Sequence, residues 1–285
     1  MKNLIYYFQK AYKEHWAIGQ FNFSDWSQVK GIVEAAKNLK SPIILGTSEG
    51  ESKFVGLAEA VAMRNILRKK TGLPIFLNLD HGKSVDYLKE AIAAGYDMVH
   101  FDGSKLALDE NIKQSKKVIV AAHRKGVIVE GEVGRFGTDA SKVYTGKFEI
   151  KEEDLTKPAD AAHYLAKTKA DVLAVSIGTF HGLDASGVSP RLRFDRLKDI
   201  KHEVDIPMVL HGGSGTPTED IKAAIVMGIS KVNINTETRV AFKESLKTQL
   251  ATEEITPYKF MQEPIKAVQM VIEEKIKLFG SENKA

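Results

Sequence analysis

Eight short apolar segments recur along this 285-residue chain, and longer stretches with helical spacing of their apolar residues lie between them. The short segments are rich in Val and Ile and often apolar throughout, which is typical of strands buried on both faces of a parallel sheet. We predict strands at residues 17–23, 42–47, 75–80, 98–102, 127–133, 172–177, 208–210 and 231–235.

This alternation continues without a Pro-rich or Gly-rich linker. It therefore predicts one α/β domain over residues 1–285, folded as a (β/α)8 TIM barrel with an extra C-terminal helix at 264–279. A doubly wound open sheet is the alternative that the same pattern allows. We expect the polar tail after the last helix to fray. The connections at 134–157 and 182–193 are longer than a barrel needs, which is typical of lids and binding loops.

Composition excludes several classes of protein. The chain has no cysteine, so a bound metal must rely on His, Asp and Glu, and the chain has neither disulfides nor a thiol nucleophile. Its 41 basic and 37 acidic residues form no basic stripe, so nucleic acid is a poor candidate for a partner. The N-terminus lacks the apolar core of a signal peptide, and no apolar run reaches the roughly 18 residues that span a bilayer. We therefore expect a cytoplasmic protein with no membrane partner.

Three histidines, His81, His181 and His211, stand at the ends of three predicted strands, and glycine follows each one. The C-terminal ends of barrel strands converge on the face that holds the active site. A catalytic zinc typically takes three protein ligands and leaves a fourth position open. The pattern therefore predicts a three-histidine metal site, although a single histidine at a strand end is more often an ordinary polar residue. We expect the other histidines to lie on the surface, except His100, which we expect to be a satisfied residue inside the barrel.

Acidic residues accompany these histidines at the strand ends. Asp80 directly precedes His81, and because strand neighbours face opposite ways, one would line a metal and the other a substrate. Asp80 would then be either a proton acceptor or a partner that orients a ligand imidazole. Asp102, Glu130 and Glu132 end the fourth and fifth strands, and the two glutamates share one strand face. A metal, a sugar hydroxyl or a ligand histidine would partner these carboxylates, with ion pairs to Lys or Arg as the alternative.

Two turns that follow the last two strands are suited to an anion. Segment 211–217 reads His-Gly-Gly-Ser-Gly-Thr-Pro, and segment 233–236 reads Asn-Ile-Asn-Thr and opens a helix. Barrels commonly bind phosphate at these two positions, where glycine amides and a helix N-terminus attract negative charge. We predict a phosphate site there, with a pair of ordinary tight turns as the alternative.

Taken together, these segments resemble the class II, metal-dependent fructose-bisphosphate aldolase family, which includes tagatose-bisphosphate aldolases. The resemblance extends from residue 19 to the final helix. Its most specific motifs are Leu79-Asp80-His81-Gly82, Glu130-Gly131-Glu132-Val133-Gly134, Gly178-Thr179-Phe180-His181-Gly182, Leu210-His211-Gly212-Gly213-Ser214-Gly215 and Lys231-Val232-Asn233-Ile234-Asn235-Thr236.

The resemblance implies a role for each matching residue. The three strand-end histidines, His81, His181 and His211, would bind zinc, and Asp80 would take the proton of the C4 hydroxyl. Glu132 and Asp102 would lie near a second, looser position for a monovalent or divalent cation. The residues implied for the dihydroxyacetone phosphate half are Gly182, Gly212, Ser214, Asn233 and Thr236, with Asn22 and Ser48 at the mouth.

The implied activity is reversible cleavage of a ketose bisphosphate to dihydroxyacetone phosphate and glyceraldehyde 3-phosphate through a zinc-stabilised enediolate. Fructose 1,6-bisphosphate is the leading substrate. The partner is then a small sugar phosphate, and the family suggests a homodimer or homotetramer.

Two loops depart from the family pattern. Segment 137–141 lacks the paired acids that usually follow a Gly-Gly, and segment 183–187 lacks a lysine that helps to hold phosphate. These departures leave the metal chemistry intact but leave the distal phosphate, and hence the substrate, open. The alternatives are tagatose 1,6-bisphosphate or another ketose phosphate, a zinc barrel hydrolase, and a non-catalytic sugar-phosphate-binding barrel.

Overall fold

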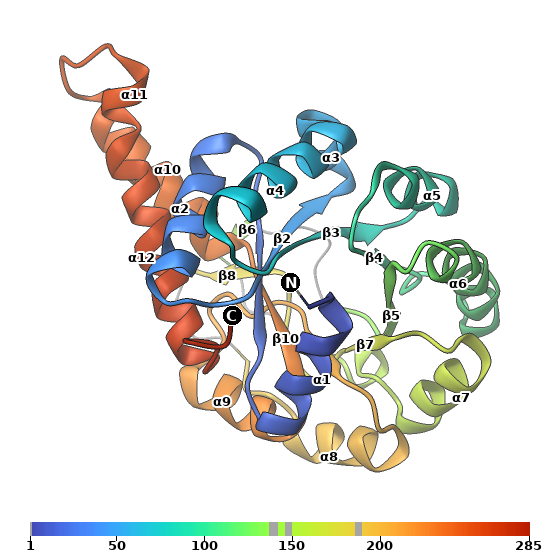
Figure 1. Cartoon of the computed structure of the whole chain (residues 1–285). Helices are drawn as coiled ribbons and strands as arrows, with labels where there is room; N and C mark the ends of the chain where they lie inside the picture. Colours follow the sequence, from blue (N-terminus) through green and yellow to red (C-terminus); the bar gives the residue numbers. More distant parts are fainter. Residues whose placement is uncertain (1, 137–141, 146–149, 186–189) are drawn as a thin grey trace.

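Eight parallel strands close into a barrel in the computed structural model, which describes residues 2–136, 142–145, 150–185 and 190–285 (Figure 1). Around the barrel the strands follow the order β1, β10, β9, β7, β5, β4, β3 and β2. They are β1 (Ile18–Asn22), β2 (Ile43–Ser48), β3 (Ile75–Gly82), β4 (Met98–Phe101), β5 (Ile128–Val133), β7 (Val172–Val175), β9 (Met208–Leu210) and β10 (Ile229–Ile234). The predicted (β/α)8 barrel is confirmed, and the open-sheet alternative is wrong.

Helices surround the barrel, and all but α1, which lies across one end, are placed around its outside (Figure 1). They are α1 (Leu4–Glu14), α2 (Trp26–Asn38), α3 (Glu49–Val55), α4 (Leu57–Thr71), α5 (Val85–Ala94), α6 (Leu108–His123), α7 (Pro158–Thr168), α8 (Phe194–Glu203), α9 (Thr218–Val226), α10 (Thr236–Leu250), α11 (Pro257–Phe260) and α12 (Gln262–Leu278), with a 3-10 turn at Glu152–Asp154. The extra C-terminal helix predicted at 264–279 is α12.

The two long loops contribute a second, small sheet that the apolar pattern did not reveal. Strand β6 (Lys142–Tyr144) pairs in parallel with β8 (Gly182–Asp184). The connections after β5 and β7 are therefore held together by backbone hydrogen bonds beside the barrel mouth.

Helix α1 lies across one end of the barrel and closes it with apolar side chains (dark blue in Figure 1). Its buried face is formed by Leu4, Tyr7, Phe8 and Ala11. This face packs on the first inward-facing layer of the strands, which consists of Ile18, Ile44, Phe76, Met98, Ile128, Val172, Ala174 and Val209. Because this end of the barrel is filled with apolar groups, the polar chemistry is confined to the opposite end.

The barrel interior becomes polar toward the C-terminal strand ends. Residues two apart on a strand face the same way, so His100 follows Met98 into the interior, and Glu130 and Glu132 follow Ile128. All five side chains are buried. The shared face that the sequence predicted for the two glutamates is therefore the inside of the barrel.

The C-terminal tail is docked rather than frayed, which corrects the expectation from its polar composition. The amide of Asn283 donates to the carbonyl of Leu39 at 2.8 Å, and the amide of Ala285 donates to that of Lys40 at 3.0 Å. Ser281 is fully buried and lies 3.1 Å from the hydroxyl of Ser41. Backbone hydrogen bonds to the end of α2 fix the tail, and a composition-based argument does not detect such bonds.

Within the described ranges, none of the helices combines the length and apolar character needed to cross a membrane.

Helices α2 and α12 pack closely through Gly31. A Cβ atom at this position would lie 2.6 Å from the carbonyl oxygen of Ile265 and 2.9 Å from Cβ of Val268. We expect Gly31→Ala to lower the free energy of unfolding by about 1–3 kcal/mol, because backbone atoms of α12 would have to move. Gly50→Ala is the matched control, since nothing lies within 4 Å of its added methyl group. Equal denaturation midpoints for both variants would contradict this packing.

Candidate active site

A cavity of about 360 Å³ opens at the C-terminal ends of the barrel strands. This volume lies at the lower end of the ~300–1,000 Å³ typical of ligand pockets. Every site residue predicted from the sequence lines it: Asn22, Ser48, Asp80, His81, Asp102, Glu132, His181, Gly182, His211, Gly212, Ser214, Asn233 and Thr236. The fold therefore brings together residues from strand ends and loops all around the barrel.

A bulge in β3 turns both Asp80 and His81 toward the cavity. The pairing with β4 runs from Leu79 opposite Val99 directly to Gly82 opposite Phe101, so two β3 residues face one β4 residue. His81 adopts a left-handed backbone conformation with φ of 51°. Simple alternation would have separated the two side chains, but the bulge lets both line the same cavity.

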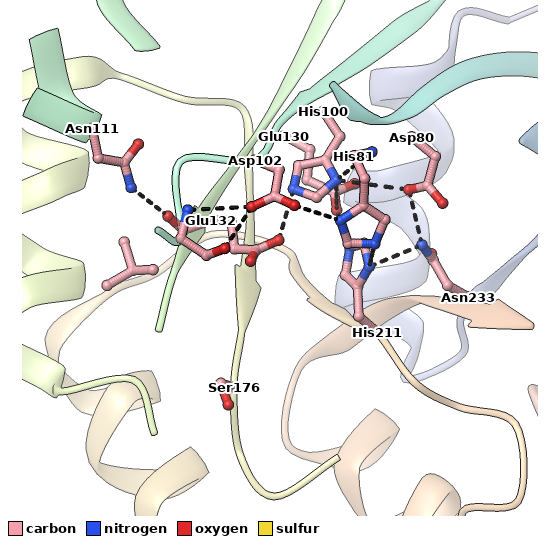
Figure 2. Close-up of polar contacts among 12 residues, drawn as sticks. Asp80, His81, His100, Asp102, Asn111, Glu130, Glu132, Ser176, His211 and Asn233 are labelled. Carbon is pink, nitrogen blue, oxygen red and sulfur yellow. Dashed lines mark hydrogen bonds and ion pairs between the residues drawn. The ribbon is translucent and has the colours of Figure 1, made fainter. Parts of the chain in front are cut away.

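Two histidines face each other at the centre of the site (Figure 2). Nδ1 of His81 lies 3.1 Å from Asp102 Oδ2, and Nε2 of His211 lies 2.6 Å from Glu130 Oε1. Each carboxylate requires a proton on the nitrogen that faces it, so the other nitrogen of each neutral ring carries a lone pair. These lone-pair nitrogens, Nε2 of His81 and Nδ1 of His211, lie 3.0 Å apart.

This arrangement fits a metal ion. Two ligand nitrogens of a tetrahedral zinc site lie about 3.3 Å apart when each Zn–N bond is ~2.0–2.1 Å. A carboxylate behind each ligand imidazole is the usual way to fix its tautomer and orientation. When both rings are neutral, two lone pairs face each other at 3.0 Å and repel, and a metal ion or a proton held between them removes that repulsion.

The pKa values of the two rings differ because their surroundings differ. Burial, together with the neighbouring imidazoles, lowers the pKa of His211 to about 4, so this ring is neutral at neutral pH. Burial also acts to lower the pKa of His81, but the charge of Asp80 and the hydrogen bond to Asp102 raise it above its usual value. The His211 ring is therefore available as a ligand over a wide pH range, whereas a metal must compete with a proton at His81.

His181 lies beside this pair. Its ring centroid is 4.7 Å from that of His81 and 5.9 Å from that of His211. Phe136 packs against both His181 and His211, with ring centroids 5.1 Å and 5.2 Å away. In the part of the chain that the structure describes, the ligand atoms within 4.8 Å of one another come from two overlapping groups: Asp80, His81, His100 and His211, and His81, Asp102 and Glu132.

Asp80 is held by two amide side chains. Nδ2 of Asn22 donates to one carboxylate oxygen at 3.1 Å, and Nδ2 of Asn233 donates to the other at 3.2 Å. Burial acts to raise the pKa of Asp80, but His81 and the contact with His100 lower it well below its usual range. Asp80 is therefore an ionised, oriented carboxylate beside the histidine pair.

Glu130 forms an ion pair with a buried lysine, which is the alternative that the sequence allowed for the buried carboxylates. Its second oxygen lies 2.6 Å from Nζ of Lys231, and both side chains are fully buried. Burial acts to raise the pKa of Glu130, but Lys231 and the nearby imidazoles hold it well below its usual range. Glu132 behaves differently, because burial and then the charge of Asp102 raise its pKa.

His100 lies inside the barrel, as the sequence predicts, but its contacts with the site are closer than the sequence indicated. Its ring is fully buried and lies within 2.9 Å of Glu132 and 3.7 Å of Asp80. The signal was present, because His100 precedes Asp102 by two residues and therefore faces the same interior.

The two predicted phosphate loops are joined to each other. The hydroxyl of Ser214 accepts hydrogen bonds from the amides of Asn235 and Glu237, each at 3.3 Å. The Glu237 carboxylate in turn accepts from the amide of Gly215 at 2.6 Å and pairs with Lys275 at 2.6 Å. Gly212 has a φ of 66°, which a residue with a side chain rarely adopts.

Three cationic side chains also line the cavity: Lys83, Lys105 and Arg239. Arg239 forms an ion pair with Glu51, which is the N3 residue of a capping box with Ser48 at the start of α3. Glu51 and Arg239 were missed from the sequence because they come from helices rather than strand ends. The loop 137–141, whose missing acids left the protonating residue open, lies outside the described residues, as does 186–189.

Comparison with known proteins decides the family. A family model described as class II fructose-bisphosphate aldolase matches residues 2–284. The chain belongs to the class II fructose-bisphosphate aldolase family. The chain is therefore an aldehyde-lyase, from a family that is generally metal-dependent and acts on sugar phosphates.

Named relatives of this aldolase differ in their substrates. A sulfofructosephosphate aldolase from Alkalicoccus urumqiensis is 36% identical over 280 residues, which cover 97% of this chain and 96% of the relative. A 6-phospho-5-dehydro-2-deoxy-D-gluconate aldolase from Shouchella clausii strain KSM-K16 is 37% identical over 280 residues, covering 96% and 93%. The crystal structure of the YdjI aldolase from Escherichia coli K12 superposes with a TM-score of 0.85 at 31% identity, covering 100% of this chain and 99% of that one.

The buried pair of Glu130 and Lys231 allows a test of the site's electrostatics. We expect Lys231→Met to lower the free energy of unfolding at pH 7 by about 3–5 kcal/mol, because it leaves a buried carboxylate without its cation. The loss should shrink as the pH falls toward 5, since Glu130, no longer held at a low pKa, takes up a proton in the folded state. The double variant Lys231→Met/Glu130→Gln should lose less at pH 7. Denaturant unfolding at both pH values measures this, and a pH-independent loss would contradict it.

Proposed function

We propose that this protein reversibly cleaves a ketose bisphosphate to dihydroxyacetone phosphate and an aldehyde. Fructose 1,6-bisphosphate is the leading substrate, and glyceraldehyde 3-phosphate is then the aldehyde. The observation that carries the proposal is the pair of imidazole nitrogens 3.0 Å apart, each backed by a carboxylate, beside the buried Asp80.

In this proposal His81, His211 and His181 hold a zinc ion at the barrel mouth. Bound there, the metal supplies Lewis acidity that stabilises the negative charge developing when the C3–C4 bond breaks. Asp102 and Glu130 fix the tautomers of two of these rings, so that the nitrogens facing the cavity keep their lone pairs. A second cation position near Glu132 and Asp102 also belongs to this proposal, since both side chains join His81 in one cluster of potential ligands.

Asp80 acts as the base in the cleavage direction. Its carboxylate is ionised and oriented by Asn22 and Asn233, so it can accept the proton of the C4 hydroxyl. In the synthetic direction the same group returns that proton. The fixed orientation matters because proton transfer requires the donor and acceptor to lie within about 2.6–3.2 Å.

The substrate's two ends meet different surfaces. The loops at Gly212, Ser214 and Thr236, with Gly182, offer amide and hydroxyl donors for the phosphate of the dihydroxyacetone half. Lys83, Lys105 and Arg239 also line the cavity and provide positive charge for a distal anion. Asn22 and Ser48 complete this lining.

Relatives provide the main alternative, which is a different anion at the distal end. The names of the two relatives above describe a sulfonated sugar phosphate and a gluconate phosphate. Cationic side chains would attract a phosphate, a sulfonate or a carboxylate alike. Tagatose 1,6-bisphosphate and other ketose phosphates therefore remain the second candidates for the substrate.

The proposal also includes a homodimer or homotetramer, with neither nucleic acid nor a membrane as partner. Large apolar side chains near α11 are strongly exposed, with Ile255 at 88% and Tyr258 at 70%. Figure 1 shows that α11 and the neighbouring ends of α10 and α12 project from the barrel. Sedimentation of the purified protein would decide its oligomeric state.

Metal removal tests the proposed chemistry. We expect a chelator to abolish aldol cleavage and added zinc to restore it. His181→Ala should bind less zinc and lose more activity than the ~10–100-fold typical of residues that only support a ligand. His202→Ala is the control, because that side chain is 86% exposed on α8. Full cleavage by the metal-free protein, or unchanged zinc content in His181→Ala, would refute the proposal.

A panel of substrates tests the distal end. We expect Lys105→Met to reduce kcat/KM for fructose 1,6-bisphosphate by about tenfold, because a charged hydrogen bond to the distal anion is lost. The value for a ketose monophosphate without that anion should change little. Lys113→Met on α6 is the control, since this exposed lysine pairs with Glu110 away from the cavity.

The same panel separates the classes of activity. Equal kcat/KM values for the bisphosphate and the monophosphate would refute the proposal that the protein recognises a distal anion. Hydrolysis without aldol cleavage would favour a zinc barrel hydrolase, and binding without turnover would favour a non-catalytic sugar-phosphate-binding barrel.

A further inference from the structure

His100 occupies the one β4 position that faces the β3 bulge. Leu79 pairs with Val99 and Gly82 with Phe101, so Asp80 and His81 together lie opposite His100. A bulge takes a backbone amide out of the regular ladder, and a buried amide without an acceptor is costly. Here the amide of His81 donates to the ring nitrogen Nδ1 of His100 at 3.1 Å.

This bond fixes the tautomer of His100. Because Nδ1 accepts a hydrogen bond, it carries a lone pair, and the proton of the neutral ring sits on Nε2. Nε2 lies 2.9 Å from an oxygen of Glu132, in a contact whose angle falls outside hydrogen-bond geometry. One fully buried ring therefore contacts the backbone of a proposed metal ligand and the carboxylate of a neighbouring acid (Figure 2).

We propose that His100 is a positioning residue that holds the Asp80–His81 bulge in place and orients the Glu132 carboxylate beside the metal-binding nitrogens. It acts through two separate atoms. Nδ1 fixes the backbone at His81, which directs the His81 ring toward His211. Nε2 lies 2.9 Å from Glu132 and orients its carboxylate within the ligand cluster that it forms with His81 and Asp102.

Packing alone does not account for a histidine here. Met98, two residues earlier on the same inward face, lies in the apolar layer and shows that this strand accepts an apolar side chain. An apolar residue at position 100 would fill the space but would leave the His81 amide without its acceptor and would remove the 2.9 Å polar contact with Glu132. The ring also lies 4.8 Å from that of His81 and 4.9 Å from that of His211, measured between centroids, so it supports both sides of the histidine pair.

The two ring atoms can be tested separately. In His100→Asn the amide oxygen can stand near the position of Nδ1 and keep the acceptor for the His81 amide. In His100→Gln the amide nitrogen can stand near Nε2 and keep the contact with Glu132. His100→Leu removes both. His202→Leu, on the exposed face of α8, is the matched control.

Two measurements without substrate carry the test. Zinc affinity is measured by competition with a coloured chelator, and the coordination of the metal is followed by the visible absorption of the cobalt-substituted protein. We expect His100→Leu to weaken zinc binding about 10–100-fold, as for other residues that orient a ligand. His100→Asn should recover most of that affinity but alter the cobalt spectrum, because Glu132 loses the contact that orients it beside the metal ligands. His100→Gln should keep the spectrum but not the affinity.

The inference rests on the metal site of the proposed function, but the two can fail separately, because neither measurement involves aldol cleavage. If all three variants bind zinc within about threefold of the wild type and keep its cobalt spectrum, His100 has no positioning role. If His100→Leu does not fold, the comparison of Asn with Gln decides, and equal affinities overturn the proposal. In folded variants, kcat should fall while KM stays close to that of the wild type, since His100 does not line the cavity.

Discussion

Two buried imidazole nitrogens 3.0 Å apart set the requirement that the surrounding polar groups meet. Asp102 and Glu130 lie behind the two rings, so the lone pairs point at each other and repel when both rings are neutral. Glu130 remains ionised behind His211 because Lys231 is buried beside it and imidazoles lie close to it. These buried groups depend on one another, and removing any member leaves another without its partner. A cation between the rings, either a metal or a proton taken up by His81, removes the repulsion. The two carboxylates hold the rings in the orientation that a metal needs.

Such a network needs a rigid frame, and the apolar end of the barrel provides it. The layer from Ile18 to Val209 and the face of α1 fill one end with tightly packed side chains. Packing of this kind tolerates little displacement, so the strands enter the polar region with fixed positions and directions. The same alternation that buries Met98 then points His100 into the interior, and Ile128 likewise leads to Glu130. The same strands therefore supply the apolar core at one end of the barrel and the polar site residues at the other.

Features that follow from the periodicity of apolar residues could be predicted from the sequence. Features that depend on the pairing register of two strands, or on contacts between distant segments, could not. The eight strands and the convergence of His81, His181 and His211 follow from alternation and the barrel rule, and the cavity contains all three. The bulge at Asp80–His81 could not be predicted, because it is a mismatch between two strands and neither strand encodes it alone. For the same reason the sequence predicts no more than an ordinary interior residue at His100. The docked tail and the β6–β8 pair depend on backbone hydrogen bonds between segments far apart, which composition does not reveal.

The two ends of the proposed substrate site differ in their side chains, which are buried and hydrogen-bonded at one end and exposed and cationic at the other. This difference bears on specificity. The metal half consists of buried, mutually hydrogen-bonded side chains whose positions are fixed by the barrel, so it is suited to the part of the reaction that all substrates share. The distal half depends on Lys83 and Lys105, which are exposed, and on Arg239, which is partly exposed and already paired with Glu51. Long cationic side chains in contact with water recognise charge more than shape, and salt screens them. A site of this kind can accept a phosphate, a sulfonate or a carboxylate with small changes, whereas a change at His81 or His211 would affect every substrate. The named relatives, whose names give different substrates, are consistent with this division of the proposed site.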